Sequence, residues 1–131
     1  MPDQAVRVLV VDDDPFIRDV LRRFLEDKGF DIATAVDGNR ALKAISSYAP
    51  DVVLLDIHMP SMSGMECLEQ IAAEGTDCGV IMISGDSDGE QARKSLEMGA
   101  ADYICKPFDL DYLETSLLVK LAAMGRPAVT A

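Results

Sequence analysis

The chain has 131 residues, of which 49% are hydrophobic and 27% are charged, and these values fit one compact globular domain. Its longest apolar runs, such as residues 8–11 and 52–55, are far shorter than the roughly 20 residues that a membrane-spanning helix needs. The formal net charge of -11 opposes the negative field of nucleic acids, so we expect no direct nucleic-acid binding.

Two pairs of a strand and a helix open the chain. A β-branched run at residues 6–11 predicts the first strand. Asp14-Pro15 then supplies a helix N-cap followed by proline at the first helical position, and this helix ends at Gly29. A second strand fits residues 31–36. The next helix opens at the turn formed by residues 37–39 and is closed by Pro50.

Three further strands and three helices follow. Residues 51–56 predict a strand whose apolar centre is typical of burial on both faces of a parallel sheet. A loop at residues 57–63 leads into a helix at 64–74, and a strand at 80–84 precedes a helix that ends near Gly99. The last strand is short and covers residues 102–105. The final helix carries a seam of leucines: Leu110, Leu113, Leu117, Leu118 and Leu121.

Regular alternation of strands and helices predicts an α/β fold, a doubly wound parallel sheet of five strands with five helices on its two faces. Ligands of such sheets bind beyond the carboxyl ends of the strands. Polar residues of this sequence fall at those ends. We expect them to converge on one edge of the sheet: Asp12, Asp13, Asp56, Ser84 and Lys106.

The predicted edge calls for a divalent cation. Two carboxylates about 4 Å apart repel by about 4 kcal/mol at an effective dielectric constant of 20, so Asp12, Asp13 and Asp56 would not stay ionised together unaided. Mg²⁺ suits such a pocket, because it takes one or two carboxylates and completes its coordination with water and phosphate oxygens. With Lys106 as a further positive charge and no His or Cys base, the pattern indicates phosphoryl transfer, with Asp56 as the best-placed acceptor.

Several strings of the chain resemble the receiver domains of bacterial two-component response regulators. The resemblance extends from about residue 6 to residue 124, with the motifs in the family's order and spacing. The strings are the acidic run at 10–14, the segment 54–60 followed by Gly64, Ser84-Gly85, and residues 103–108.

The resemblance implies a flavodoxin-like sheet in the strand order 2-1-3-4-5 and a phosphorylation site at Asp56. It implies that Asp13, Asp56 and the backbone carbonyl of His58 bind Mg²⁺, while Asp12 holds a metal-bound water. Lys106 and the Ser84 hydroxyl would contact the phosphoryl group. By the same resemblance, Ser84 and Tyr103 are switch residues, and Lys106-Pro107 is a cis peptide bond.

A receiver domain is a signalling switch that catalyses only its own phosphorylation and dephosphorylation. The resemblance implies a histidine kinase or a histidine phosphotransfer protein as phosphodonor and an unidentified target protein. It also implies an output surface on the fourth helix, fifth strand and fifth helix, with a phosphorylation-linked homodimer as an option. We expect the domain at residues 1–124 and a disordered tail at 125–131.

Some residues have further roles that the sequence leaves open. His58 and Asp86 lie two residues beyond Asp56 and Ser84, where they could tune the lifetime of the phosphorylated form. Basic residues of the first helix, among them Arg18 and Arg22, form either a solvated face or a docking site for the phosphodonor.

Two rival functions stay open on the sequence alone. Asp12-x-Asp14 after a strand resembles the nucleophile motif of haloacid dehalogenase phosphatases, although Pro15 departs from that motif. The second rival is an interaction module that keeps the fold but is never phosphorylated.

The cysteines and the N-terminus bear on the compartment. Cys67, Cys78 and Cys105 are odd in number and have no C-x-x-C spacing, which favours small buried hydrophobic side chains over a disulfide framework or a zinc site. The N-terminus lacks the basic stretch of a signal peptide. We therefore expect a cytoplasmic protein.

Overall fold

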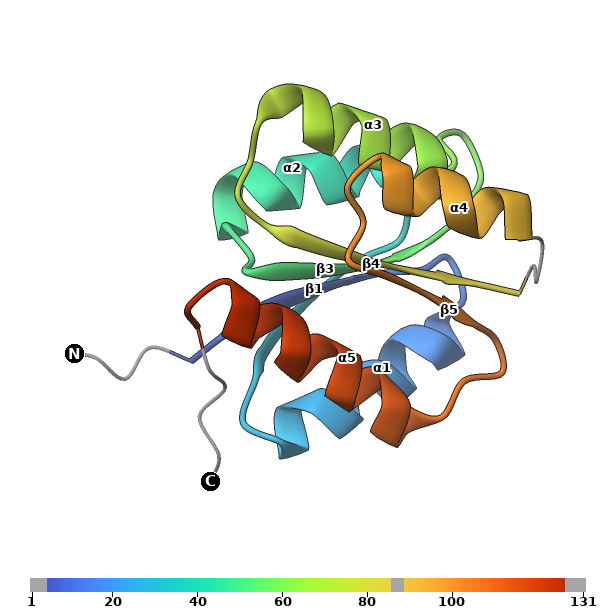
Figure 1. The fold of residues 1–131 in the computed structure, drawn as a ribbon. Coiled ribbons are helices and arrows are strands. Elements are labelled where there is room, and N and C mark those ends of the chain that lie inside the picture. The colour runs from blue at the N-terminus through green and yellow to red at the C-terminus, as the bar shows by residue number, and fades with distance from the viewer. Residues whose placement is uncertain (1–4, 86–88, 127–131) are drawn as a thin grey trace.

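The computed structural model describes residues 5–85 and 89–126 and shows a three-layer α/β sandwich (Figure 1). Its parallel sheet has the strand order β2-β1-β3-β4-β5, so the predicted flavodoxin-like topology is confirmed. The strands are β1 (Arg7–Val11), β2 (Asp31–Ala35), β3 (Val52–Asp56), β4 (Gly79–Ser84) and β5 (Asp102–Cys105). The helices are α1 (Pro15–Asp27), α2 (Gly38–Tyr48), α3 (Gly64–Glu74), α4 (Gly89–Glu97) and α5 (Leu110–Ala123).

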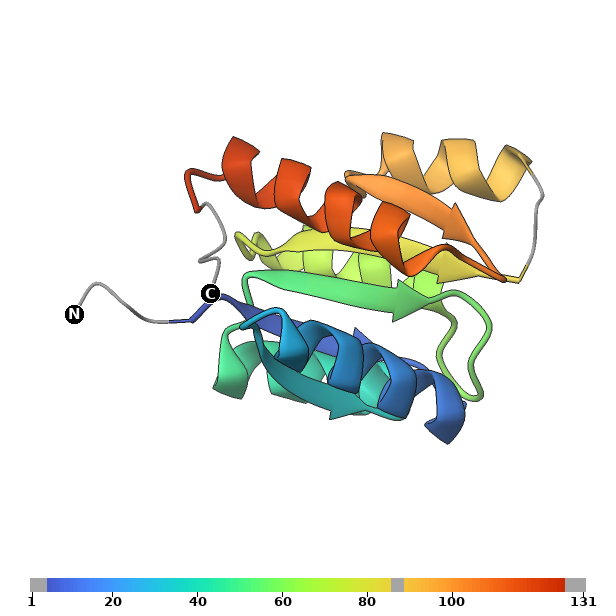
Figure 2. The same ribbon diagram turned by 90° about the horizontal axis from the view of Figure 1, so that it is seen from below.

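The helices divide between the two faces of the sheet, with α1 and α5 on one face and α2, α3 and α4 on the other (Figures 1 and 2). Successive strand residues point to opposite faces, so each strand contributes to two separate cores. Leu54, for example, packs toward α1 and α5, whereas its neighbours Val53 and Leu55 pack toward α2 and α3.

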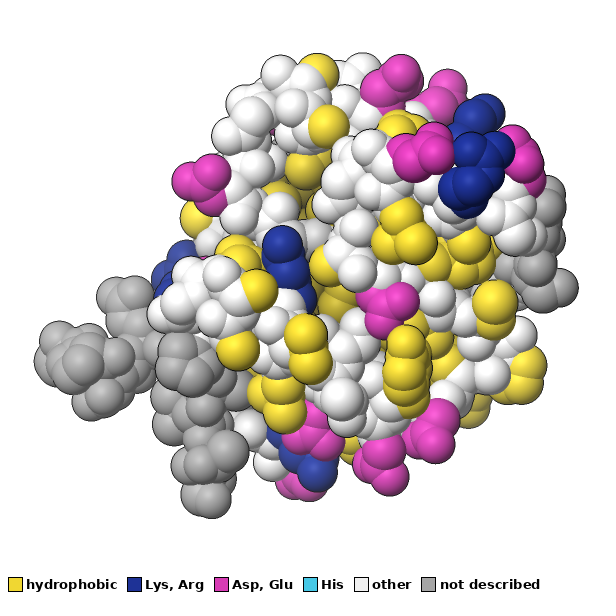
Figure 3. Space-filling model, in the orientation of Figure 1, with side chains coloured by type: hydrophobic (Ala, Val, Ile, Leu, Met, Phe, Trp, Pro, Cys, Tyr) yellow, Lys and Arg dark blue, Asp and Glu magenta, His cyan; other side chains and the backbone are white. Residues whose placement is uncertain are grey.

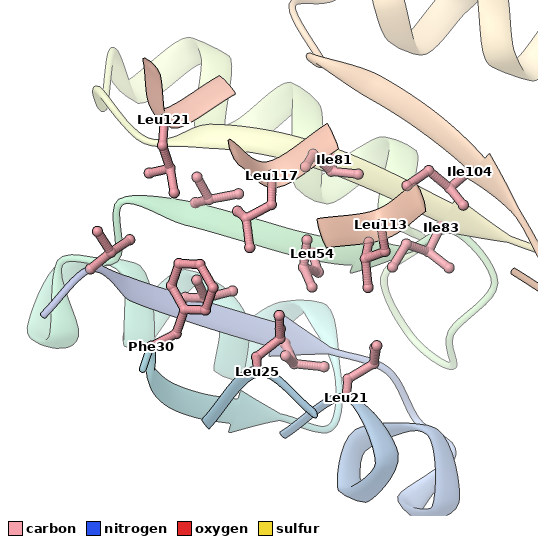
Figure 4. Close-up of a cluster of buried hydrophobic side chains, with 14 residues drawn as sticks. Leu21, Leu25, Phe30, Leu54, Ile81, Ile83, Ile104, Leu113, Leu117 and Leu121 are labelled. Atoms are coloured by element: carbon pink, nitrogen blue, oxygen red, sulfur yellow. The ribbon is translucent and has the colours of Figure 1, made fainter. Parts of the chain in front are cut away.

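Leucines of α1 and α5 fill the first of these cores (Figure 4). Leu21 and Leu25 of α1 meet Leu113 and Leu117 of α5 over the strand residues, and all four are at most 1% exposed. Burying one such side chain stabilises the fold by about 1.5–3 kcal/mol. The leucine seam predicted for the last helix is therefore correct at positions 113, 117 and 121, whereas Leu118 is 36% exposed.

Side chains at the helix starts satisfy free backbone N–H groups, as the sequence indicates for α1. Asp14 accepts a hydrogen bond from the Phe16 N–H, with Pro15 at the first helical position. At α3, the Ser63 hydroxyl accepts from the Glu66 N–H while the Glu66 carboxylate accepts from the Ser63 N–H. These caps fix where the helices begin relative to the carboxyl ends of the strands.

The predicted burial of the cysteines holds only in part, and the chain makes contacts as far as Arg126. Arg126 forms an ion pair with Asp51 at 2.6 Å, and its backbone N–H donates to Leu121; residues 127–131 lie outside the described part of the chain. All three cysteines are free, but only Cys67 is buried, and Cys105 is exposed, so the prediction of buried thiols is wrong for Cys105. No helix within the described residues has the length and apolar character needed to cross a membrane.

Gly64, the first residue of α3, lies directly against the backbone at the end of β3. A Cβ atom at this position would be 2.2 Å from the Asp56 carbonyl oxygen and 2.7 Å from the Ile57 Cα. Both neighbours are backbone atoms, which cannot move aside as the end of a side chain could. The Gly64 N–H also donates to the Ile57 carbonyl at 2.7 Å. Glycine is therefore required for α3 to start close to Asp56.

We expect Gly64→Ala to lower the free energy of unfolding by about 1–3 kcal/mol, because the added methyl group must displace backbone. Gly89→Ala is the matched control, since Gly89 also begins a helix and a Cβ there meets no atom within 4 Å. Urea unfolding of both variants checks this. Equal stability of Gly64→Ala and wild type would contradict the close approach.

Candidate functional site

The register of the sheet brings the ends of three strands level. Val11 pairs with Leu55, so Asp12, the next residue after β1, comes level with Asp56 at the end of β3. On the other side of β3, Asp56 pairs with Ile83, and Ser84 pairs with Cys105. The predicted convergence of polar residues on the carboxyl edge of the sheet thus follows from strand pairing.

Three carboxylates meet at this edge. Asp12, Asp13 and Asp56 each offer an oxygen, and these oxygens lie within 4.8 Å of one another. Asp12 and Asp56 are 2% and 4% exposed, whereas Asp13 is exposed. Such a spacing allows one small cation to contact more than one carboxylate. The ligand atoms are carboxylate oxygens, and the cluster is open to water on the side of Asp13. Mg²⁺ prefers oxygen ligands of this type.

Lys106 reaches into the same cluster from the end of β5. Its Nζ atom is 2.9 Å from an Asp12 oxygen and 3.3 Å from an Asp56 oxygen. The side chain of Lys106 is 24% exposed, so water screens these pairs less than it would screen surface pairs. One lysine against three carboxylates leaves the cluster with an excess of negative charge. The Lys106-Pro107 peptide bond is cis, as the resemblance implies.

The surroundings of Asp56 disfavour its charged form. Burial, and next the charge of Asp12, raise the pKa of Asp56 above its ordinary value, and the attraction of Lys106 does not cancel them. For Lys106, burial lowers the pKa, but its hydrogen bonds to and attraction by Asp12 and Asp56 outweigh that effect, so the pKa is raised. Lys106 therefore stays protonated. The charged form of Asp56 is destabilised by its surroundings, and a second cation near the carboxylate would offset that destabilisation.

Both carboxylate oxygens of Asp12 and its backbone carbonyl oxygen accept hydrogen bonds, which the sequence does not indicate. One carboxylate oxygen accepts from the Asp14 N–H at 2.9 Å, and the other accepts from Lys106. The backbone carbonyl of Asp12 accepts from the Arg18 guanidinium at 2.7 Å. A carboxylate held in this way is poorly placed to act as a nucleophile, which argues against the phosphatase interpretation. Within the described residues, the Asp56 carboxylate accepts from Lys106 but from no backbone N–H, so it is the better acceptor.

The loop between β3 and α3 begins at Ile57 and carries His58 two residues after Asp56. Ile57 is anchored by its N–H to Ile83 and by its carbonyl to Gly64, and His58 follows it as an exposed residue. Met62 lies over Gly38 at the start of α2, where a Cβ would be 2.9 Å from the Met62 sulfur. The loop is thus fastened at both ends while His58 stays at the rim.

The predicted switch residues occupy the two strands beyond β3. Ser84 is fully buried at the end of β4, one residue past the partner of Asp56. Tyr103 is half-buried in β5 and packs against the core under α2 and α3. Asp86, the second residue considered for tuning the phosphorylated state, lies outside the described residues.

The basic residues of α1 are neutralised by acidic residues rather than grouped into a free positive face. Arg22 pairs with Asp19 and Glu26, and Arg23 also pairs with Asp19. The spacing of three or four residues along a helix allows these contacts and was visible in the sequence. Arg18 differs, because it turns back to the loop after β1, a contact that the sequence interpretation missed.

Comparisons with known proteins agree with this geometry. A family model described as response regulator receiver domain matches residues 8–118. The probable C4-dicarboxylate response regulator DctR of Priestia megaterium is 40% identical over 119 residues, which cover 89% of this chain and 52% of that protein. The protein-glutamate methylesterase/protein-glutamine glutaminase 2 of Caulobacter vibrioides is 46% identical over 105 residues, covering 78% and 30%. The chain thus spans about half the length of these curated relatives, or less.

Solved structures show the same fold. A CheY-like receiver domain protein from Methanospirillum hungatei has a TM-score of 0.88 at 31% identity, covering 93% of this chain and 98% of that chain. The receiver domain of a LuxO repressor protein from Vibrio parahaemolyticus has a TM-score of 0.89 at 27% identity, covering 93% and 94%. Because the family model spans most of the sequence and the strand-end carboxylates converge, the chain belongs to the response regulator receiver domain family, whose members are signalling switches.

Proposed function

We propose that Asp56 accepts a phosphoryl group from a phosphohistidine on a histidine kinase or histidine phosphotransfer protein. The observation that carries the proposal is the cluster of Asp12, Asp13 and Asp56 with Lys106 paired to two of them. In this cluster Asp13, Asp56 and the His58 carbonyl would bind Mg²⁺, with Asp12 holding a metal-bound water. When bound, Mg²⁺ supplies positive charge that offsets the charge on the phosphoryl oxygens.

The reaction asks the protein for position and charge more than for acid–base chemistry. An oxygen of Asp56 attacks phosphorus while the bond from phosphorus to the imidazole nitrogen breaks, and the electron pair of that bond returns to the nitrogen. Lys106 would leave its carboxylate partners and contact a phosphoryl oxygen. The Ser84 hydroxyl would donate a hydrogen bond to another phosphoryl oxygen.

The product changes the balance of charge at the edge of the sheet. A phosphoryl group brings close to two negative charges and three acceptor oxygens. Contacts of Ser84 and Lys106 with it would bias β4, β5 and the neighbouring Tyr103 toward a second arrangement, if the two arrangements differ by only a few kcal/mol. We infer that the affected surface is formed by α4, β5 and α5. Leu96 of α4 and Tyr112 and Val119 of α5 are exposed apolar side chains. Hydrophobic side chains are visible among polar ones on the face shown in Figure 3.

The phosphodonor would dock beside Lys106 through apolar contacts. A hollow of about 440 Å³ between α1 and the start of α5 is lined by Ile17, Val20, Lys106, Pro107, Phe108 and Leu110. Phe16, which precedes Ile17 in the chain, is 71% exposed and adds apolar surface at the start of α1. The paired state of Arg22 and Arg23 makes this hollow a better docking site than the basic face of α1.

The remaining assignments belong to the same proposal. Residues 1–124 would be the receiver domain, acting in the cytoplasm where histidine kinases phosphorylate such domains. The net charge of -11 favours output through a protein target, or through a homodimer formed on phosphorylation, over direct binding to nucleic acid.

We expect acetyl phosphate and Mg²⁺ to add the mass of one phosphoryl group to the wild-type protein, because the site itself supplies the catalytic groups. Asp56→Asn should abolish the addition, whereas Asp27→Asn, at the exposed end of α1, should not. Mass spectrometry of the intact proteins is the measurement. A phosphoryl group on Asp56→Asn, or none on the wild type, would contradict the assignment.

A second prediction concerns pH. Since the pKa of Asp56 is raised in the folded protein, its carboxylate opposes folding at any pH above that pKa. Without Mg²⁺, Asp56→Asn should therefore have a Tm a few degrees above that of the wild type at pH 7. The difference should shrink as the pH falls through the raised pKa, and vanish below the ordinary value of 3.8.

Thermal unfolding of both proteins in a chelator, between about pH 4 and pH 8, measures this difference. Subtracting one Tm from the other removes the contribution of the other titrating groups that the two proteins share. A difference that stays constant with pH, or a wild type that is more stable at pH 7, would show that Asp56 is not under electrostatic strain.

A further inference from the structure

Arg18 makes a contact that sets it apart from its basic neighbours on α1. Its Nη1 atom donates to the backbone carbonyl of Asp12 at 2.7 Å, across the turn that joins β1 to α1. Arg22 and Arg23, by contrast, pair with carboxylates of their own helix. Arg18 is half-buried, and its contact partner belongs to a residue that is 2% exposed. The contact therefore lies beneath the surface, where water competes for it less strongly than at an exposed pair.

Asp12 is held at four points. Its backbone N–H donates to the Ala35 carbonyl, and its other three contacts come from three further parts of the chain. The Asp14 N–H holds one carboxylate oxygen, Lys106 holds the other, and Arg18 holds the backbone carbonyl. The bond from the Asp14 N–H is local, and the bond from Lys106 depends on the position of β5. The third bond, from Arg18, joins the backbone carbonyl of Asp12 to a side chain of α1, and a charged donor makes it stronger than an ordinary hydrogen bond.

The carbonyl that Arg18 holds belongs to the peptide unit between Asp12 and Asp13. A peptide unit is planar, so fixing its carbonyl oxygen also fixes the direction of the Asp13 N–H and limits the positions of the Asp13 Cα and Cβ. Asp13 is the exposed member of the acidic cluster, and the burial that holds Asp12 and Asp56 in place does not hold its side chain.

We propose that Arg18 is a positioning residue that orients the Asp12–Asp13 peptide so that the Asp13 carboxylate faces Asp56 before a cation binds. This inference rests on the proposed function, because it concerns the same Mg²⁺ site. Arg18 contacts neither the cation nor the phosphoryl group. It acts through Asp13 and lowers the conformational cost of assembling the ligands.

A purely electrostatic role for Arg18 makes the opposite prediction. A positive charge close to the pocket repels a divalent cation, so its removal would tighten Mg²⁺ binding. Removal of a positioning contact weakens Mg²⁺ binding. The sign of the change therefore distinguishes the two roles.

The test compares Arg18→Met, which keeps an aliphatic side chain but no donor, with Arg18→Lys, which keeps a charged donor. Arg40→Met is the matched control. The exposed Arg40 occupies the first turn of α2, and its guanidinium pairs with the half-buried Asp37 carboxylate at 3.6 Å. Mg²⁺ is titrated into each 131-residue protein by calorimetry. The rate of phosphorylation by acetyl phosphate is then followed as a function of Mg²⁺ concentration.

We expect Arg18→Met to weaken Mg²⁺ binding about tenfold (about 1.4 kcal/mol). The Mg²⁺ concentration that gives half the maximal phosphorylation rate should rise by the same factor, while the maximal rate falls less than about threefold. Arg18→Lys should bind Mg²⁺ more tightly than Arg18→Met, and Arg40→Met should behave as the wild type does. A Tm close to that of the wild type without Mg²⁺ would show that the change does not arise from unfolding.

Unchanged or tighter Mg²⁺ binding by Arg18→Met would overturn the positioning role. That outcome leaves the proposed function intact as long as the wild type binds Mg²⁺ and is phosphorylated on Asp56. Failure of the wild type to bind Mg²⁺ would instead contradict the proposed function itself.

Discussion

Repulsion among Asp12, Asp13 and Asp56 is the constraint on which the rest of this structure depends. The strand register places these carboxylates within 4.8 Å of one another, and two of them are almost fully buried. Lys106 offsets part of the negative charge but leaves an excess. Burial, and next the charge of Asp12, raise the pKa of Asp56. The site is therefore assembled in a state that a divalent cation and then a phosphoryl group can change.

The fold resists that repulsion through rigid surroundings. Asp56 ends a central strand whose neighbours on both sides are paired, and Gly64 brings the start of α3 against its backbone. Arg18 and the Asp14 N–H hold Asp12 from the opposite side. Because these contacts involve backbone atoms, Asp12 and Asp56 cannot move apart without disturbing β1, β3 or α1. Stability of the sheet thus maintains an arrangement that electrostatics alone would not.

The sequence predicts much of this fold and of the site because both depend on local signals. Asp14-Pro15 marks the start of α1, the buried run of β3 marks a central strand, and the position of Asp56 at its end follows. Contacts that depend on the three-dimensional arrangement of side chains were not predictable in the same way. The bond from Arg18 to the Asp12 carbonyl and the ion pair of Arg126 with Asp51 depend on where side chains lie in space, which no spacing in the sequence specifies. The exposure of Cys105 has the same origin, since it sits at the end of an edge strand.

The most direct test of this account is the effect of Mg²⁺ on the free energy of unfolding. At a free Mg²⁺ concentration about 100 times its Kd, binding to the folded state should stabilise the wild type by about 2.7 kcal/mol. Asp13→Asn should lose most of this gain, because it removes a ligand, while Glu69→Gln, on the exposed side of α3, should keep it. Equal stabilisation of the wild type and Asp13→Asn would contradict the claim that the acidic cluster binds the cation.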